Sequence, residues 1–363
     1  MATDSLVLDY YNDPPAKAGI HSAITAFFDR GGGHCDLGRY SKESLLLEET
    51  VVVKDDRGVG YLAMKKDSTT ETIVSLTAVL VDASLPPYRD TKSLFQTRRG
   101  KKDIPVNRVS LAWYGHSTYE ATRVGFENIR TQFSLMYDGM DKIPVAVVAG
   151  QPAITCENRI VSKVEQVPDG VQDVDIGPGQ DPNGIIKTNL LSSPNYRYVE
   201  DNSITYAKIT GRTETGDLTI ESCLPEELKV GMIVCVQVAP CVVPTVKRGF
   251  KVILKLRNVL AVSDDVYKAY VFKARISDYN NTPKPGGGLK RSASLPQWVS
   301  NKKNPFTMAD VRMRDEREEQ NEGQNESGEG AAGGIVERFG RLNTRPSTGT
   351  MNGDRSEGAN SSS

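Results

Sequence analysis

The residue types most capable of chemistry in this chain are five cysteines and three histidines, and their spacing favours neither a disulfide framework nor a metal site. The cysteines are Cys35, Cys156, Cys223, Cys235 and Cys241. Their number is odd and no CxxC pair occurs, so we expect reduced thiols in an intracellular protein. His34 and Cys35, in the motif GGGHC, offer two ligands to a metal, but no second pair follows, so we favour a flexible glycine turn and expect no metal or other cofactor.

Catalytic motifs are equally scarce in the sequence. None of the histidines lies in a nucleophile setting such as GxSxG, and the chain has no GxxxxGK[ST] phosphate loop. His116 follows a strand pattern and precedes a helix start, which favours a capping or surface role. The segment GVGYLA (58–63) lacks the third glycine and the helix of a dinucleotide site, so it predicts a hairpin turn. We therefore expect a protein that is not an enzyme.

Basic clusters are more informative. Arg98, Arg99, Lys101 and Lys102 lie in a predicted loop between strands. In the run KRGFKVILKLR, the cations Lys251, Lys255 and Arg257 alternate with apolar residues, so a strand would place them on one face. Cations neutralise phosphates and aromatic rings such as Phe250 and Trp298 stack bases, which is typical of single-stranded nucleic-acid binding. The alternative is a solvated strand face whose lysines protect a sheet edge.

Strand patterns dominate the elements that would position these residues. The predicted strands are 49–54, 60–65, 73–82, 107–114, 143–149, 203–211, 217–222, 231–238, 250–262 and 266–276. The run 143–149 is expected to be buried, and Ser263-Asp264-Asp265 is expected to form a hairpin turn. One clear helix is predicted from Thr118 to Met136, and 167–194 is a predicted loop. The sequence thus predicts a mostly β, antiparallel β-sandwich or jelly-roll-like body with one or two helices.

The chain divides by composition into three parts. We expect an N-terminal extension (1–48), a β-rich body (49–282) and a disordered tail (283–363) that cannot bury enough apolar surface to fold. The tail is basic at its start, with five cations and no acid between Lys284 and Lys303. There, Arg291-Ser292-Ala293-Ser294-Leu295-Pro296 predicts phosphorylation of Ser294 and binding of a 14-3-3-type adaptor, against the alternative of a basic, soluble linker.

The sequence features that bear on location favour an intracellular protein. The first fifteen residues are acidic and contain Pro14 and Pro15, unlike a secretory leader. No apolar run approaches the roughly 18 residues of a spanning helix. We therefore expect a chain that is not secreted and that contacts membranes only peripherally. The formal net charge of −1 hides local segregation of charge and decides nothing about partners.

A family resemblance adds to this interpretation. Leu80-Val81-Asp82 at the end of a strong strand, followed by Gly150 after IPVAVVA, resembles the core of the thirty-kilodalton superfamily of plant-virus movement proteins. The resemblance covers roughly 49–150. It implies a non-enzymatic jelly-roll core that binds single-stranded nucleic acid and associates with plasmodesmata, with Asp82 and Gly150 as structural core positions.

Two other functions fit the same features. A viral matrix or coat-like structural protein would share the β-rich body and the tail. An adaptor regulated by phosphorylation of its tail would share the motif at Ser294. Self-association is compatible with all three. Salt-sensitive binding of RNA favours a movement protein, whereas assembly on acidic membranes without RNA favours a matrix protein.

Overall fold

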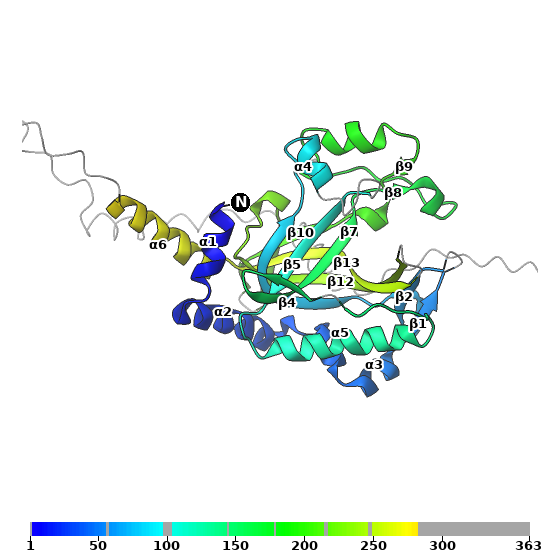
Figure 1. Ribbon diagram of the computed structural model, residues 1–363, viewed down its shortest axis with the longest axis horizontal. Helices are drawn as coiled ribbons and strands as arrows, with labels where there is room; N and C mark the ends of the chain where they lie inside the picture. Colours follow the sequence, from blue (N-terminus) through cyan, green and yellow to red (C-terminus); the bar gives the residue numbers. More distant parts are fainter. Residues whose placement is uncertain are drawn as a thin grey trace, which may run out of the picture. The chain divides into compact units, whose positions relative to one another are not determined.

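The computed structural model describes residues 2–55, 58–96, 104–143, 145–177, 179–213, 217–245 and 249–281 (Figure 1). Side chains are described between 6 and 276 within these ranges. Of these residues, 2–270 belong to one compact unit and 271–281 to a second. All of the architecture that follows concerns the first unit. The predicted tail, 283–363, lies outside the described residues.

The first unit is β-rich. Its strands are β1 Thr50–Lys54, β2 Gly60–Met64, β3 Asp67–Glu71, β4 Val74–Ser84, β5 Val106–Ala112, β6 Ala146–Val148, β7 Gln151–Arg159, β8 Ser162–Lys163, β9 Tyr196–Arg197, β10 Thr205–Arg212, β11 Leu218–Ser222, β12 Ile233–Pro244 and β13 Phe250–Ser263. The α-helices of the described chain are α1 Ala2–Tyr10, α2 Pro14–Phe27, α3 Glu43–Glu49, α4 Thr91–Gln96, α5 Thr118–Ser134 and α6 Asp265–Asn281, the last of which continues into the second unit.

Five of the strands close into a ring. Hydrogen bonds link β12 to β4, β4 to β5, β5 to β7, β7 to β13, and β13 back to β12. All of these pairings are antiparallel except β7 with β13. Outside the ring, β2 extends from β12, and β10 pairs with β13 in parallel while β11 completes that side. The prediction of a β-rich, mainly antiparallel body is therefore confirmed.

Apolar side chains pack on both faces of β4, one strand of the ring. On β4, Leu76 and Leu80 join the main cluster, whereas Val79 and Val81 join a second one. A strand buried on both faces reads as a nearly continuous apolar run, and in IVSLTAVLV even the two polar residues, Ser75 and Thr77, are buried. Helix α5 adds buried residues to the first cluster, and α1 and α2 cover the second. Figure 1 shows α5 and α3 on one side of the strands, and α4 with β8 and β9 on the other.

Helix α5 approaches the chain that precedes it closely because of one glycine. A Cβ atom at Gly125 would overlap the carbonyl oxygen of Leu37, in the 3₁₀ turn η2 (Leu37–Ser41). Asn128 on the same helix donates to the carbonyl oxygens of Tyr40 (2.9 Å) and Ser41 (3.2 Å). The sequence therefore uses the smallest residue where helix and turn meet backbone to backbone.

The structure corrects several predicted elements at the chain's ends. Six α-helices occur in the described residues where one or two were predicted. Three of them, α1, α2 and α3, begin within residues 2–48, where Tyr11, Ile20 and Ile24 are buried. The predicted strand 266–276 is helix α6. Ser263-Asp264-Asp265 caps that helix, since the Ser263 hydroxyl accepts from the Asp265 amide, and Asp264 pairs with Lys268 one turn later.

Two further differences lie in the middle of the chain. The run 143–149 is not buried, since β6 is short and Val145 and Val147 are 56% and 70% exposed. Strand β7, which the sequence analysis did not predict, carries the ring contacts instead. The loop 167–194 is mostly confirmed, with one π-helical turn at Lys187–Leu191. Within the described residues, no helix has both the length and the apolarity needed to span a membrane.

Candidate anion-binding pocket and the predicted site residues

Of the predicted nucleic-acid-binding cations, only those on β13 can be placed. Arg98, Arg99, Lys101 and Lys102 lie outside the described residues, so their role stays a prediction. On β13, Lys251, Lys255 and Arg257 occupy alternate positions, as the pattern required. They become less exposed along the strand: Lys251 and Lys255 are half-buried, and Arg257 is buried.

Arg257 does not face solvent, and its predicted contact with phosphate is wrong. Its side chain is 6% exposed, with Nη2 2.5 Å from Glu71 Oε2 and Nη1 2.7 Å from Asp201 Oδ1. Lys255 also pairs with Asp201. Burial pushes the pKa of Asp201 up, but the two cations outweigh it and hold that pKa well below its ordinary range. These charges form an internal network that ties β3 to β13 and to the 3₁₀ turn η5 (Glu200–Asn202).

The two positions of the family resemblance occupy defined places. Asp82 lies near the end of β4, at a register shift, and pairs with Arg108 on β5 at 3.5 Å. Gly150 (φ 73°) and Ala149 (φ 49°) form the two-residue loop between β6 and β7. A two-residue hairpin loop with both φ angles positive is a type I′ turn, where glycine is favoured. Both positions therefore have local structural reasons of their own.

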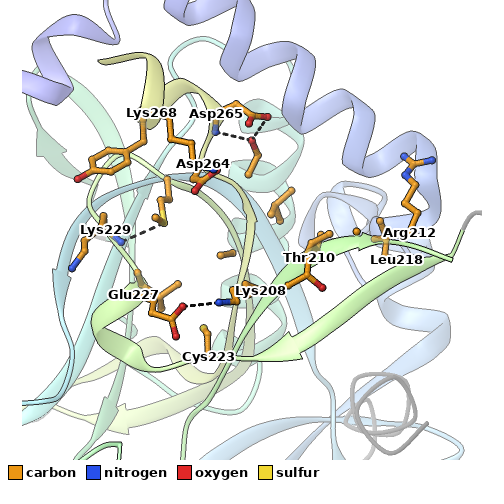
Figure 2. Close-up of a pocket in the computed structure, with 18 of the residues that line it drawn as sticks. Lys208, Thr210, Arg212, Leu218, Cys223, Glu227, Lys229, Asp264, Asp265 and Lys268 are labelled. Atoms are coloured by element: carbon orange, nitrogen blue, oxygen red, sulfur yellow. Dashed lines mark hydrogen bonds and ion pairs between the residues drawn. The ribbon is translucent and has the colours of Figure 1, made fainter. Parts of the chain in front are cut away.

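A pocket of about 690 Å³ opens beside β10 and the edge strand β11 (Figure 2). Its walls also come from the segment 223–232, from the junction of β13 with α6, and from Arg30 in the π-helical turn η1 (Phe28–Gly32). Apolar side chains line part of it: Ile209, Leu218, Leu228, Met232, Ala261 and Val262. Tyr267 adds an aromatic ring. This size and lining suit a small organic ligand or one unit of a polymer.

Positive charge predominates around this pocket. Five cationic side chains face three acidic ones: Arg30, Lys208, Arg212, Lys229 and Lys268 against Glu227, Asp264 and Asp265. Lys208 pairs with Glu227 at 2.8 Å and Lys268 with Asp264 at 2.9 Å, both at partly exposed positions (Figure 2). Arg30 and Arg212 are exposed and have no acidic partner within the described part of the chain. The arrangement is suited to an anion with an apolar portion.

The remaining residues with chemical potential lie elsewhere. All five cysteines are free, and burial raises the pKa of Cys241 and Cys235 to about 12 and that of the pocket thiol, Cys223, to about 11. In the described ranges, no three His, Cys, Asp or Glu side chains are grouped to hold a metal ion. His116 accepts at Nδ1 from the Thr118 amide (3.3 Å), the capping role that its place before a helix predicted.

The sequence analysis did not predict the pocket. Its cations are spread from Arg30 to Lys268 and come together only because β10 pairs with β13 and η1 follows α2. The one local signal was Lys208, on the predicted strand 203–211, with Arg212 directly after that strand. Neither the known protein families nor the curated proteins include a match to this chain.

Proposed function

We propose that this chain is a non-enzymatic viral movement protein, which binds single-stranded nucleic acid and carries it between plant cells through plasmodesmata. The observation that carries the proposal is the pocket beside β10 and β11, which five cations and several apolar side chains line together. Phosphates need cations and bases need apolar or aromatic surface, and a single strand presents both. Such a site binds without reading sequence.

The charge pattern of the pocket favours phosphate at its rim. Arg30 and Arg212 are available to the first phosphates, since neither has an acidic partner in the described residues. The ion pairs of Lys208 and Lys268 are partly exposed, and exposed ion pairs contribute little because water and salt screen them. Phosphate can therefore replace Glu227 or Asp264 at little cost.

The rest of the proposal comes from the sequence. A jelly-roll-type core, with Asp82 and Gly150 at its family positions, would be the scaffold that presents this pocket. The predicted tail would add cations between Lys284 and Lys303 and a phosphorylation switch at Ser294 read by a 14-3-3-type adaptor. The proposed location is the cell periphery and the plasmodesmata of the host cell, with peripheral membrane contact.

Salt-dependent binding of a fluorescent single-stranded RNA oligonucleotide tests the proposal. Changing Arg30, Lys208, Arg212 and Lys229 to Gln should flatten the slope of log affinity against log salt by about 3, at about 0.7 per phosphate contact. The matched control changes four cations remote from the pocket, Arg123, Arg130, Lys163 and Arg197, to Gln and should leave the slope unchanged.

Equal slopes for the two variants would overturn the assignment of the pocket. Binding to anionic vesicles without binding to the oligonucleotide would favour the matrix-like alternative instead. A fluorescent fusion expressed in plant epidermal cells tests the cellular part of the proposal. Foci that span the cell wall are expected, and a diffuse signal or a nuclear one would contradict it.

A further inference from the structure

Two histidines join helix α2 to the turn that precedes α5. The rings of His21 and His116 lie 5.1 Å apart between centroids and are nearly perpendicular. His21 Nε2 lies 3.1 Å from the carbonyl oxygen of Tyr114, and Thr25, one turn further along α2, bonds to His116 Nε2 at 3.2 Å. Both of these hydrogen bonds between α2 and the turn 114–118 therefore involve an imidazole.

The hydrogen bonds fix where the protons lie. A carbonyl oxygen only accepts, so His21 carries its proton on Nε2. The amide of Thr118 donates to His116 Nδ1 (3.3 Å), so Nδ1 is unprotonated and Nε2–H donates to Thr25. The neutral ring of His116 thus caps the start of α5 with one nitrogen and holds α2 with the other.

Protonation of His116 disrupts this arrangement in two ways. An N–H at Nδ1 can no longer accept from the Thr118 amide and turns instead to the Thr118 hydroxyl, 2.8 Å away, and the new positive charge lies beside His21. Burial, followed by the influence of His21, lowers the pKa of His116 from its ordinary 6.5. Other titratable groups nearby are Tyr114 in the same turn and Glu120 on α5, but Glu120 is paired with Arg123. None of these groups offers the imidazolium a carboxylate.

Helix α2 leads directly into the pocket. It ends at Phe27, and the turn η1 that follows carries Arg30, which lines the pocket. A change that loosens α2 from the turn 114–118 therefore also moves Arg30, one of three pocket cations (with Arg212 and Lys229) that have no acidic partner in the described chain.

We propose that the His21–His116 pair is a pH-sensitive latch, which holds α2 against the turn 114–118 while His116 is neutral and releases that contact, together with Arg30, when His116 is protonated. Its effect on nucleic acid rests on the proposed function of the pocket, whereas the release of α2 does not. The stabilisation is fully present above the ordinary histidine pKa and is lost as pH falls through the lower pKa of His116 in the folded protein.

Hydrogen exchange of the α2 amides in the full chain tests the latch directly. Between pH 7.5 and pH 5, after correction for intrinsic rates, exchange of these amides should accelerate, because the neutral form of His116 that holds α2 is depleted as pH falls. His116→Asn keeps an acceptor at the Nδ1 position and does not titrate, so it should abolish the acceleration. His34→Asn, at the third histidine of the chain, is the matched control and should preserve it.

A second variant keeps the test decisive if His116→Asn does not fold. His21→Gln keeps the donor to Tyr114 and removes the neighbouring charge, so it should reduce the acceleration. An acceleration that is equal in wild type, His116→Asn and His21→Gln would overturn the latch.

Oligonucleotide binding separates the latch from its consequence. Simple protonation of histidines would strengthen binding of a polyanion at acid pH, whereas release of Arg30 should weaken it and lower the salt slope by about 0.7. Stronger binding at pH 5 with α2 released would overturn the link between latch and pocket. Absence of binding at every pH would overturn the proposed function, and the exchange result would still decide the latch.

Discussion

At the scale of single residues, Arg257 has its charge balanced only while both of its carboxylate partners remain. Removing one member of a buried ion-pair network leaves uncompensated charge inside the protein. We predict that Arg257→Met lowers the free energy of unfolding by about 3–5 kcal/mol, measured by urea denaturation. Lys163→Met, which removes the partly exposed pair with Glu165, should cost less than about 1 kcal/mol. Similar costs for the two variants would show that Arg257 is not held by its ion pairs.

Asp36 is a second residue with a measurable consequence. Burial raises its pKa to about 6, although a hydrogen bond from the Gly38 amide acts in the opposite direction. The folded state therefore holds a proton more tightly than the unfolded chain, so stability falls as pH rises from about 4 to about 6. Asp36→Asn keeps the acceptor for Gly38 and should stabilise the protein by about 3 kcal/mol at pH 7.5, from a pKa raised by about two units. The gain should vanish below pH 4 in urea titrations, and a gain that is constant with pH would contradict the prediction.

At the scale of elements, the contact of α5 with η2 depends on Gly125. Helix propensity alone predicts that alanine in a helix gains up to about 1 kcal/mol over glycine. The added methyl at Gly125 would overlap the backbone of Leu37, so we predict that Gly125→Ala destabilises by about 1–3 kcal/mol. Gly19→Ala on α2 is the control, because its methyl meets only the side chain of Val266 and should cost nothing or stabilise. Thermal unfolding of both variants measures whether each substitution lowers or raises the stability of the protein.

The elements differ in how far the sequence could predict them. Strands such as β4 and β13 carry long β-branched runs that local periodicity detects, and their predicted bounds agree with the structure within a few residues. Helix α6 was mistaken for a strand because Val266, Val271 and Ile276 have strand-forming side chains. The residues Ser263 to Asp265 are typical of a helix start, and the segment that follows them does form a helix. Strand β7 has Pro152 near its start and polar residues at its end, so no simple pattern marked it.

At the scale of the whole molecule, the apolar clusters of the described residues are built entirely from the chain before Val271. We therefore predict that a chain ending at Asn281 unfolds with a midpoint within about 2 °C of the full-length protein, since a loss of 1 kcal/mol would shift a protein of this size by at least that much. Differential scanning calorimetry makes the comparison. A larger drop would show that residues beyond 281 stabilise the body.

The candidate site was less predictable than the fold for a reason that also belongs to this scale. Alternation along one strand placed Lys255 and Arg257 on a common face, but it could not show that Asp201, more than fifty residues away, would occupy that face. The pocket cations come from four separate stretches of chain that only the strand pairing brings together. Charge in a sequence shows which residues can bind phosphate, and topology decides which of them are available to do so.

The closure of the ring has a consequence for the order of events on the ribosome. Strands β12 and β13 are the last to be synthesised, and they complete the ring by joining the edges of β4 and β7. Until residues 233–263 have emerged, those two edges have no partner, although most of the body already exists. Unpaired edges recruit other chains. A nascent chain stalled before β12 would therefore be prone to aggregate. Because β12 and β13 emerge late, the risk of aggregation is greatest while the chain is still being synthesised.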